Sequence, residues 1–101
     1  MSGRRVVYID DFIWLPDIID KIAVKHSLTQ NEVEDVFFDA PRYYFVEKGT
    51  RRGEDLYAAT GTTDAGRYLI VFFIHKRNNA ALIISARDMD RKERRRYERK
   101  R

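Results

Sequence analysis

Five side chains in this sequence have the types needed for acid–base and phosphate chemistry. His26 and Glu54 could take up or release a proton, and Lys25, Arg67 and Arg87 could neutralise the charge on a phosphate. Each also has a plainer interpretation. His26 could cap a helix C-terminus, Glu54 could belong to a charged hairpin loop, and the two arginines could pair with surface carboxylates.

The residue types argue against several other kinds of site. The chain has no Cys and two His, namely His26 and His75. These are far apart and lack the His-Glu-x-x-His spacing, so no metal site is expected. No glycine-rich phosphate loop, nucleophile elbow or dinucleotide fingerprint occurs, so no cofactor is expected either. His75 is interpreted as a solvent-facing hairpin residue.

Length and composition predict one globular domain over residues 1–101. The chain has 101 residues and is 44% hydrophobic, which can supply one core. Its apolar runs are too short to span a membrane, and no signal peptide is evident. The absence of Cys fits a reducing compartment. We therefore expect a cytoplasmic protein that does not contact membranes.

The basic residues gather at the C-terminal end. From Arg87 onward, nine Lys/Arg face four Asp/Glu, a net charge of +5, whereas the remaining eleven basic and twelve acidic residues net −1. A clustered basic segment attracts polyanions, above all nucleic acid. The alternative is a solvated helix face with salt bridges, and the tail alone does not separate the two.

Periodicity and capping signals predict three helices. Apolar residues at i, i+3, i+4 and i+7 predict a helix from Pro16 to about His26. A capping box at residues 29–32 begins a second helix, which ends before Pro41. A second capping-box pattern at residues 90–93 begins a final, strongly basic helix that reaches about Arg99.

The remaining apolar segments predict an antiparallel sheet of four to five strands, giving an α+β fold with two N-terminal helices and one C-terminal helix. The strands are expected at residues 5–9, 42–48, 55–60, 66–75 and 80–87. Residues 68–74 are almost continuously apolar, which indicates a central strand covered on both faces. Arg67 and Arg87 should then be neighbours at one end of the sheet, where their guanidinium groups could converge on a phosphate.

Several short motifs resemble those of the BrnT toxin family, the toxins of bacterial type II toxin–antitoxin modules. The resemblance covers about residues 14–97. It lies in Lys25-His26-Ser27, in the segment from Gly53 to Gly61, in Gly66-Arg67, and in Ile84-Ser85-Ala86-Arg87 followed by Glu93 and Tyr97. Two departures stand out. Leu82 replaces an arginine that family members often carry, and an apolar segment with Pro16 replaces an Asp-rich helix start.

This resemblance implies a RelE-like ribonuclease fold and metal-independent RNA cleavage that arrests translation. It also implies a cognate antitoxin with a ribbon-helix-helix domain, through which alone the toxin would reach operator DNA. The residues that match the family's functional motifs are Lys25, His26, Glu54, Arg67 and Arg87. The loss of an arginine at Leu82 would remove one phosphate contact and leaves open a weakened or inactive nuclease.

We therefore hypothesise an endoribonuclease in which the ribose 2′-OH attacks the adjacent phosphate. His26 or Glu54 would accept the 2′-OH proton, and Arg67, Arg87 and Lys25 would stabilise the transition state. Residues expected to contact RNA or the antitoxin are Arg52, Arg91, Lys92, Arg94, Arg95 and Tyr97. The alternative is a non-catalytic basic module that binds nucleic acid or protein, or a decayed toxin. Convergence of His26, Glu54, Arg67 and Arg87 in one cleft would favour the nuclease, whereas scattered positions would favour this alternative. The apolar segment around Trp14 leaves room for a homodimer.

Overall fold

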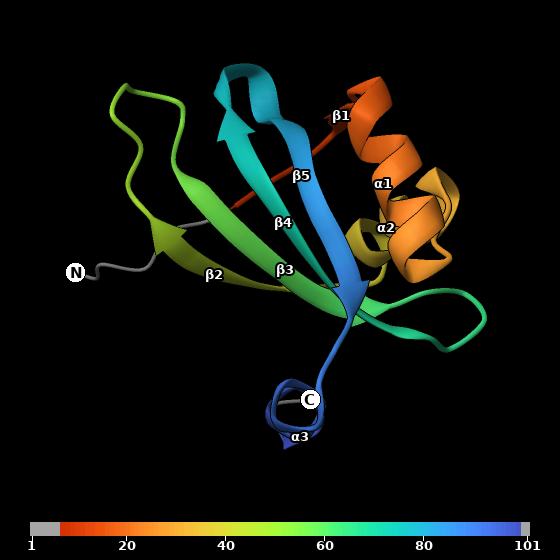
Figure 1. The fold of residues 1–101 in the computed structure, drawn as a ribbon. Coiled ribbons are helices and arrows are strands. Elements are labelled where there is room, and N and C mark those ends of the chain that lie inside the picture. Colours follow the sequence, from red (N-terminus) through yellow and green to blue (C-terminus); the bar gives the residue numbers. More distant parts are fainter. Residues whose placement is uncertain (1–6, 100–101) are drawn as a thin grey trace.

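The computed structural model describes residues 7–99, and Figure 1 shows how its helices lie around one sheet. The α+β class and all three predicted helices are confirmed. The elements in chain order are β1 (Asp11–Ile13), α1 (Pro16–His26), α2 (Gln30–Phe38), β2 (Arg42–Glu47), β3 (Leu56–Thr62), β4 (Tyr68–Lys76), the 3-10 turn η1 (Arg77–Asn79), β5 (Ala80–Asp88) and α3 (Arg91–Arg99).

The two N-terminal helices begin and end where local signals place them. Pro16 occupies the first turn of α1, and Ser27 closes the helix in the left-handed region at φ 53° while its N–H donates to the carbonyl of Ala23. Thr29 and Glu32 form the capping box of α2, with bonds of 3.1 and 3.0 Å. Within residues 7–99, no helix is long and apolar enough to cross a membrane.

The sheet has the strand order β1-β5-β4-β3-β2, so β4 is central as predicted. Strands β2 to β5 pair antiparallel, but β1 pairs parallel with β5, so the sheet is mixed rather than wholly antiparallel. The expected first strand is misplaced. Residues 7–10 are not in a strand, residues 5 and 6 lie outside the described part, and β1 begins at Asp11. Phe12 of β1 packs against Phe37 at 5.1 Å, a tertiary contact that local sequence does not reveal.

One face of the sheet forms the core with α1 and α2. Ile22 of α1 and Val36 of α2 are buried against Leu69, Val71 and Phe73, the odd-numbered residues of β4. Successive side chains of a strand point to opposite faces, so the even-numbered residues of β4 face away from these helices. Phe37 joins the cluster with its ring edge-on to Phe73 at 5.3 Å.

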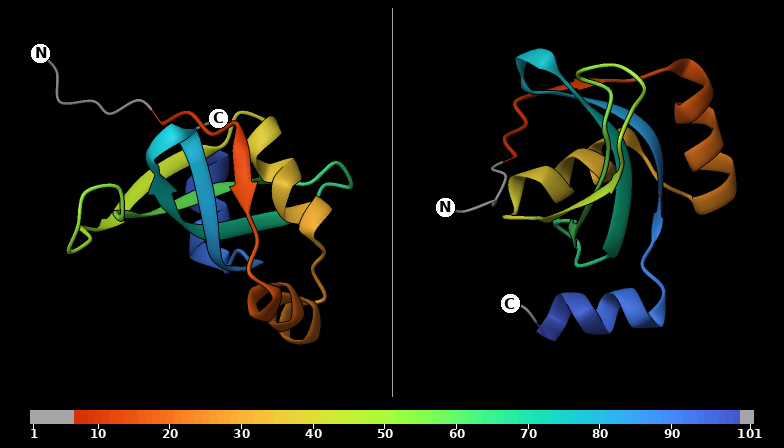
Figure 2. Two further views of the ribbon diagram at one scale, coloured as in Figure 1. Left: turned by 90° about the horizontal axis from the view of Figure 1, so that it is seen from above. Right: turned by 90° about the vertical axis from the view of Figure 1, so that its left-hand side faces the viewer.

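Helix α3 covers part of the opposite face. Figure 2 shows it lying crosswise below the strands, apart from α1 and α2. Its one buried residue is Tyr97, which meets the ring of Tyr68 edge-on at 5.9 Å. Arg94 lies over the same Tyr68 ring at 4.0 Å, and Arg96 lies over Tyr44 at 4.4 Å. The helix has almost no apolar stripe, so it is held by these aromatic and cation–π contacts together with polar contacts from Glu93 and Glu98 to the sheet.

A β-bulge in β5 exchanges the faces of its side chains. Phe73 pairs with Ile83 and Phe72 pairs with Ser85, so Ile84 is an extra residue in β5. Before the bulge the odd residue Ile83 is in the core, and after it the even residue Ala86 is. As a result Arg87 points to the α3 side of the sheet, and Asp88 points to the side of α1 and α2.

Candidate active site

Arg67, which directly precedes β4, uses all of its hydrogen-bonding capacity within the protein. A guanidinium group has five N–H donors. Five bonds leave Arg67: two to the Asp88 carboxylate at 2.7 and 3.0 Å, two to the carbonyls of His26 and Ser27 at 2.6 and 2.9 Å, and one to Glu32 at 3.5 Å. This side chain joins the C-terminal end of α1 to the end of β5.

The ionisation of Arg67 and Asp88 agrees with this role of Arg67 in linking α1 to β5. The hydrogen bond from Arg67 lowers the pKa of Asp88 below its usual value, and the same bond raises the pKa of Arg67. Neither group changes charge near neutral pH. With its five donors engaged, Arg67 has none left for a phosphate in this conformation.

Arg87 in β5 is held differently and keeps unused donors. Its two terminal nitrogens contact both carboxylate oxygens of Glu93 at 2.8 and 3.0 Å, and one of them also reaches the carbonyl of Asp88 at 3.2 Å. Among residues 7–99, neither its Nε–H nor the second hydrogen of Nη2 has a partner. Arg87 can therefore bind an additional anion while it stays paired with Glu93.

The two arginines are neighbours at one end of the sheet, but they do not converge. Arg67 binds the Asp88 carboxylate on the side of α1 and α2, whereas Arg87 binds Glu93 on the α3 side. The expected phosphate clamp built from both guanidinium groups is therefore wrong for this structure. The bulge at Ile84 is the reason, because it shifts Arg87 to the other face of the strand.

His26 and Lys25 lie at the same end of the molecule, where α1 ends. The carbonyl of His26 accepts a bond from Arg67, and the charge of His26 contributes to lowering the pKa of Asp88. Lys25 is exposed. These two residues thus lie on the α1 side of the sheet end that carries Asp88, with Arg87 on the other side.

Glu54 lies at the far end of the sheet. It precedes β3 and forms an ion pair with Lys76, the last residue of β4, at 3.5 Å. Arg67 precedes the first residue of β4. A strand rises about 3.3 Å per residue, so about 25 Å separates the two ends of β4. Glu54 cannot act on the same phosphate as Arg87, and the expected convergence of all the candidate residues in one cleft does not occur.

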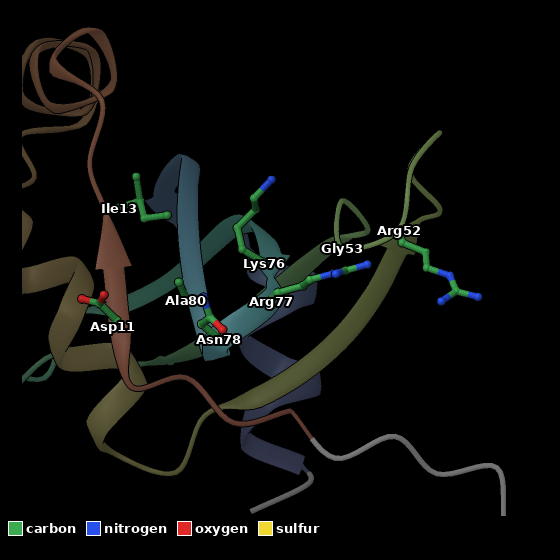
Figure 3. Close-up of a pocket in the computed structure, with 8 residues that line it drawn as sticks. All are labelled: Asp11, Ile13, Arg52, Gly53, Lys76, Arg77, Asn78 and Ala80. Atoms are coloured by element: carbon green, nitrogen blue, oxygen red, sulfur yellow. The ribbon is translucent and has the colours of Figure 1, made fainter.

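A basic hollow of about 390 Å³ occupies this far end. Figure 3 shows Arg52, Lys76 and Arg77 around it, with the Arg77 side chain extended toward Gly53. Gly53 has φ +73°, and an added Cβ would lie 3.4 Å from the Arg77 side chain. The loop therefore passes close to η1, and Arg52 stands at the opposite end of the sheet from Arg87.

Most of the predicted contact residues on α3 are exposed, and one is not. Arg91, Lys92 and Arg95 are solvent-exposed and available to a polyanion or a protein partner. Arg94 is also exposed, but its guanidinium group lies over the Tyr68 ring. Tyr97 is only 5% exposed. Its ring docks α3 on the sheet.

A family model that describes a ribonuclease toxin, BrnT, of type II toxin–antitoxin systems matches residues 14–93. The chain belongs to the BrnT toxin family. The fold is similar to that in the 1.1 Å crystal structure of the Brucella abortus ribonuclease toxin BrnT, with a TM-score of 0.58 and 18% identity. That match covers 85% of this chain and 100% of the Brucella chain. No curated protein matches the chain.

As a member of the BrnT family, the chain is a ribonuclease toxin with an antitoxin partner. Sequence reasoning had not included Glu93 and Asp88 among the functional candidates. Glu93 was interpreted as the cap of α3, and it does accept the Asp90 N–H at 2.9 Å. The same carboxylate pairs with Arg87, whose hydrogen bonds are the main cause of the lowered pKa of Glu93. The spacing Arg87-x5-Glu93 across a strand–helix junction was the available signal.

Among residues 7–99, no group of three or more His, Cys, Asp or Glu side chains is arranged to hold a metal ion.

Proposed function

We propose that this BrnT-family toxin cleaves RNA endonucleolytically in an active site centred on Arg87, without a metal ion. This cleavage arrests translation in the cytoplasm. The observation that carries the proposal is the Arg87–Glu93 pair, with contacts of 2.8 and 3.0 Å and two unused guanidinium donors among the described residues. Such a pair combines a fixed cation with a carboxylate that stays ionised at neutral pH. RNA cleavage by its own 2′-OH needs these two functions.

The proposed reaction is in-line attack of the ribose 2′ oxygen on the adjacent phosphorus. The O2′–P bond forms, the P–O5′ bond breaks, and the products are a 2′,3′-cyclic phosphate and a 5′-hydroxyl. Glu93 accepts the 2′-OH proton, and the free donors of Arg87 stabilise the charge that develops on the phosphate oxygens. The departing 5′ oxygen takes its proton from water. His26 and Lys25 lie across the sheet end from Arg87 and take no part in this step.

In this proposal Arg67 is a positioning residue and Glu54 has no catalytic part. Arg67 holds the end of α1, and with it His26, against β5 through the bonds to Asp88 and to the two helix carbonyls. Glu54 is at the opposite end of β4 from Arg87. Both assignments differ from the sequence-based hypothesis, in which these residues acted directly on the phosphate.

The test is cleavage of a mixed RNA by the purified chain in the presence of EDTA. We expect cleavage by the wild type, and at least a hundredfold loss in Arg87→Ala, in line with the removal of one transition-state donor. Arg87→Lys keeps the charge but cannot pair with Glu93 through two donors, so it should recover little activity. Glu93→Gln should lose activity, His26→Gln should keep it, and a cyclic phosphate end should be found on the products.

Glu54→Gln is the matched control, because it neutralises a carboxylate at the other end of the sheet. Full activity of Glu54→Gln beside an inactive Arg87→Ala supports the site. Unchanged cleavage by Arg87→Ala would overturn it. If the wild type fails to cleave in EDTA but binds RNA in a salt-dependent way, the non-catalytic binding module or decayed toxin would be the better description.

We also propose that the antitoxin carries a ribbon-helix-helix domain and covers the exposed basic face of α3. Arg91, Lys92 and Arg95 are exposed there, and an acidic antitoxin segment would neutralise them. Co-purification with the product of the neighbouring gene, and loss of binding in a variant that reverses these three charges, would support this interface. The molar mass of the free toxin in solution would establish whether it is a homodimer.

A further inference from the structure

A slot of about 200 Å³ lies on the α3 side of the sheet, beside the Arg87–Glu93 pair. Ala58, Thr60 and Ile70 form its floor, and Tyr44 and Phe72 stand on either side. Glu93 and Arg96 of α3 also line it, from the helix side. The slot is therefore bounded by the sheet below and by the helix above.

The strand register leaves room for a flat ring between the two aromatic side chains. Ala58 in β3 pairs with Tyr44 on one side and with Phe72 on the other. Neighbouring strands are about 4.8 Å apart, so the two aromatic residues are about 10 Å apart across the sheet. A planar group in van der Waals contact with both, at about 3.5 Å each, needs about 7 Å. Only the methyl group of Ala58 rises from the strand between them.

An arginine accompanies each of the two aromatic rings. The guanidinium carbon of Arg96 lies 4.4 Å from the Tyr44 ring centre, and that of Arg87 lies 5.8 Å from the Phe72 ring centre. Aromatic faces and guanidinium planes are the two surfaces on which unpaired RNA bases stack. The slot presents both kinds of surface within one cavity.

A buried hydroxyl group in the floor has no partner. Thr60 is 4% exposed, and among the described residues its Oγ1 makes no hydrogen bond. Thr62, two residues along the same face of β3, donates to Asp39 at 3.0 Å. Most buried polar side chains are satisfied, so the unpaired Thr60 hydroxyl indicates a ligand with a donor or acceptor on its edge. A nucleobase has such an edge, whereas an apolar side chain does not.

The slot opens toward a strip of positive charge. A second hollow of about 350 Å³ is lined by Lys92, Arg95 and Arg99 of α3, and it shares Glu93 and Arg96 with the slot. A chain that inserted one base into the slot could therefore lay its phosphates along α3. This combination of a stacking site and a cationic track is typical of single-stranded nucleic-acid binding.

We propose that this slot binds one unpaired nucleobase of the RNA and so sets the sequence preference of cleavage at Arg87. The inference rests on the proposed ribonuclease activity, whose catalytic pair lies at the edge of the slot. The base lies between Tyr44 and Phe72. The Thr60 side chain turns about χ1 on binding, so that its hydroxyl, which is buried in the free chain, bonds to the edge of the base. An apolar antitoxin side chain is the rival occupant.

The first test is an NMR titration of the isotope-labelled chain with each of the four nucleoside 3′-monophosphates and with inorganic phosphate. We expect one or two of the four bases to shift the amides of Thr60 and Phe72 much more than the others do. Phosphate alone should shift the amides of α3 and of Arg87 but not that of Thr60. Equal shifts with all four bases and with phosphate would overturn the proposal that the slot binds a base. So would amides of the slot residues that shift only when the antitoxin is added.

Thr60→Val tests the hydroxyl because it keeps the shape of the side chain. It should weaken binding of the preferred nucleotide by roughly three- to tenfold, the effect of losing one hydrogen bond, and flatten the preference among bases. Thr62→Val is the matched control, since it removes a hydroxyl that is already paired outside the slot. Equal affinities for the two variants would overturn the role of Thr60.

Cleavage mapping on random-sequence RNA separates this proposal from the activity itself. A base preference in the wild type that weakens in Thr60→Val supports the slot. Cleavage without any base preference would overturn the slot and leave the nuclease proposal intact. Base-selective binding in the titration without any cleavage would leave the slot standing and overturn the nuclease proposal.

Discussion

Arg67 and Asp88 are joined by two hydrogen bonds, from Nε at 2.7 Å and from Nη2 at 3.0 Å. The backbone carbonyl of the same Asp88 accepts a bond from Arg87 at 3.2 Å. Asp88 thus connects two arginines that lie on opposite faces of the sheet. One arginine has all its donors engaged, and the other keeps two, so the two residues differ in their capacity to bind a further anion.

We predict that Arg67→Ala destabilises the fold more than it impairs chemistry. It removes five hydrogen bonds that link the ends of α1 and β5 and Glu32 of α2, three of them to carboxylates. Because the side chain is 28% exposed, water replaces part of this loss, and we expect the free energy of unfolding to fall by about 1–3 kcal/mol. Urea denaturation measures this change in the free energy of unfolding. Arg67→Lys should recover part of the stability through its charge.

Activity of the folded fraction completes that test. Arg67→Ala should keep measurable cleavage at temperatures where it remains folded, in contrast to Arg87→Ala. A variant as stable as the wild type but inactive would show that Arg67 contacts the phosphate after all.

We predict that acid weakens the junctions at both ends of the segment from Arg87 to Glu93. Hydrogen bonds from the arginines lower the folded-state pKa values of Asp88 and Glu93 below 3.8 and 4.5 respectively. Groups with lowered pKa values contribute stability above the unfolded pKa and lose it as pH falls through the folded pKa. The free energy of unfolding should therefore decline as pH falls below about 4.5. If the free energy of unfolding changed with pH in the same way in the wild type and in the double variant Asp88→Asn, Glu93→Gln, this prediction would be wrong.

Much of the fold follows from local sequence. The capping box of α2 is present with both of its bonds, and α1 runs from Pro16 to His26 as its periodicity predicts. The apolar run in β4 correctly predicts the central strand. These features depend on neighbours within a few residues, which the sequence displays directly.

The errors come from contacts between distant segments. The first strand was placed too early because its position depends on a parallel pairing with β5, about seventy residues later. The convergence of Arg67 and Arg87 was wrong because of one extra residue, Ile84. Without that bulge, Arg87 would lie opposite Leu69 on the side of α1 and α2, near Arg67. Alternation along a strand predicts faces only while the register is unbroken.

We predict that Tyr97→Ala releases α3 from the sheet without unfolding the domain. Tyr97 is the only buried residue of α3 within residues 91–99, and the core on the other face of the sheet does not include it. Brief trypsin digestion should cleave the arginine-rich helix in Tyr97→Ala but spare it in the wild type. Tyr97→Phe keeps the ring against Tyr68 and should behave like the wild type. Equal protection of all three proteins would show that the arginine contacts suffice.

We predict that Tyr43 ionises about two pH units above an ordinary tyrosine. Burial raises its pKa from 10.0 to about 12, and its ring lies 6.0 Å from Phe73 and 6.3 Å from Phe37. The folded state holds this proton more tightly than the unfolded state, so its contribution to stability is complete below pH 10 and is lost as pH rises from 10 toward 12. Tyrosinate absorbance of the wild type minus that of Tyr43→Phe should show one step near pH 12. A step near pH 10 would instead mean that solvent reaches the phenol group in the folded protein.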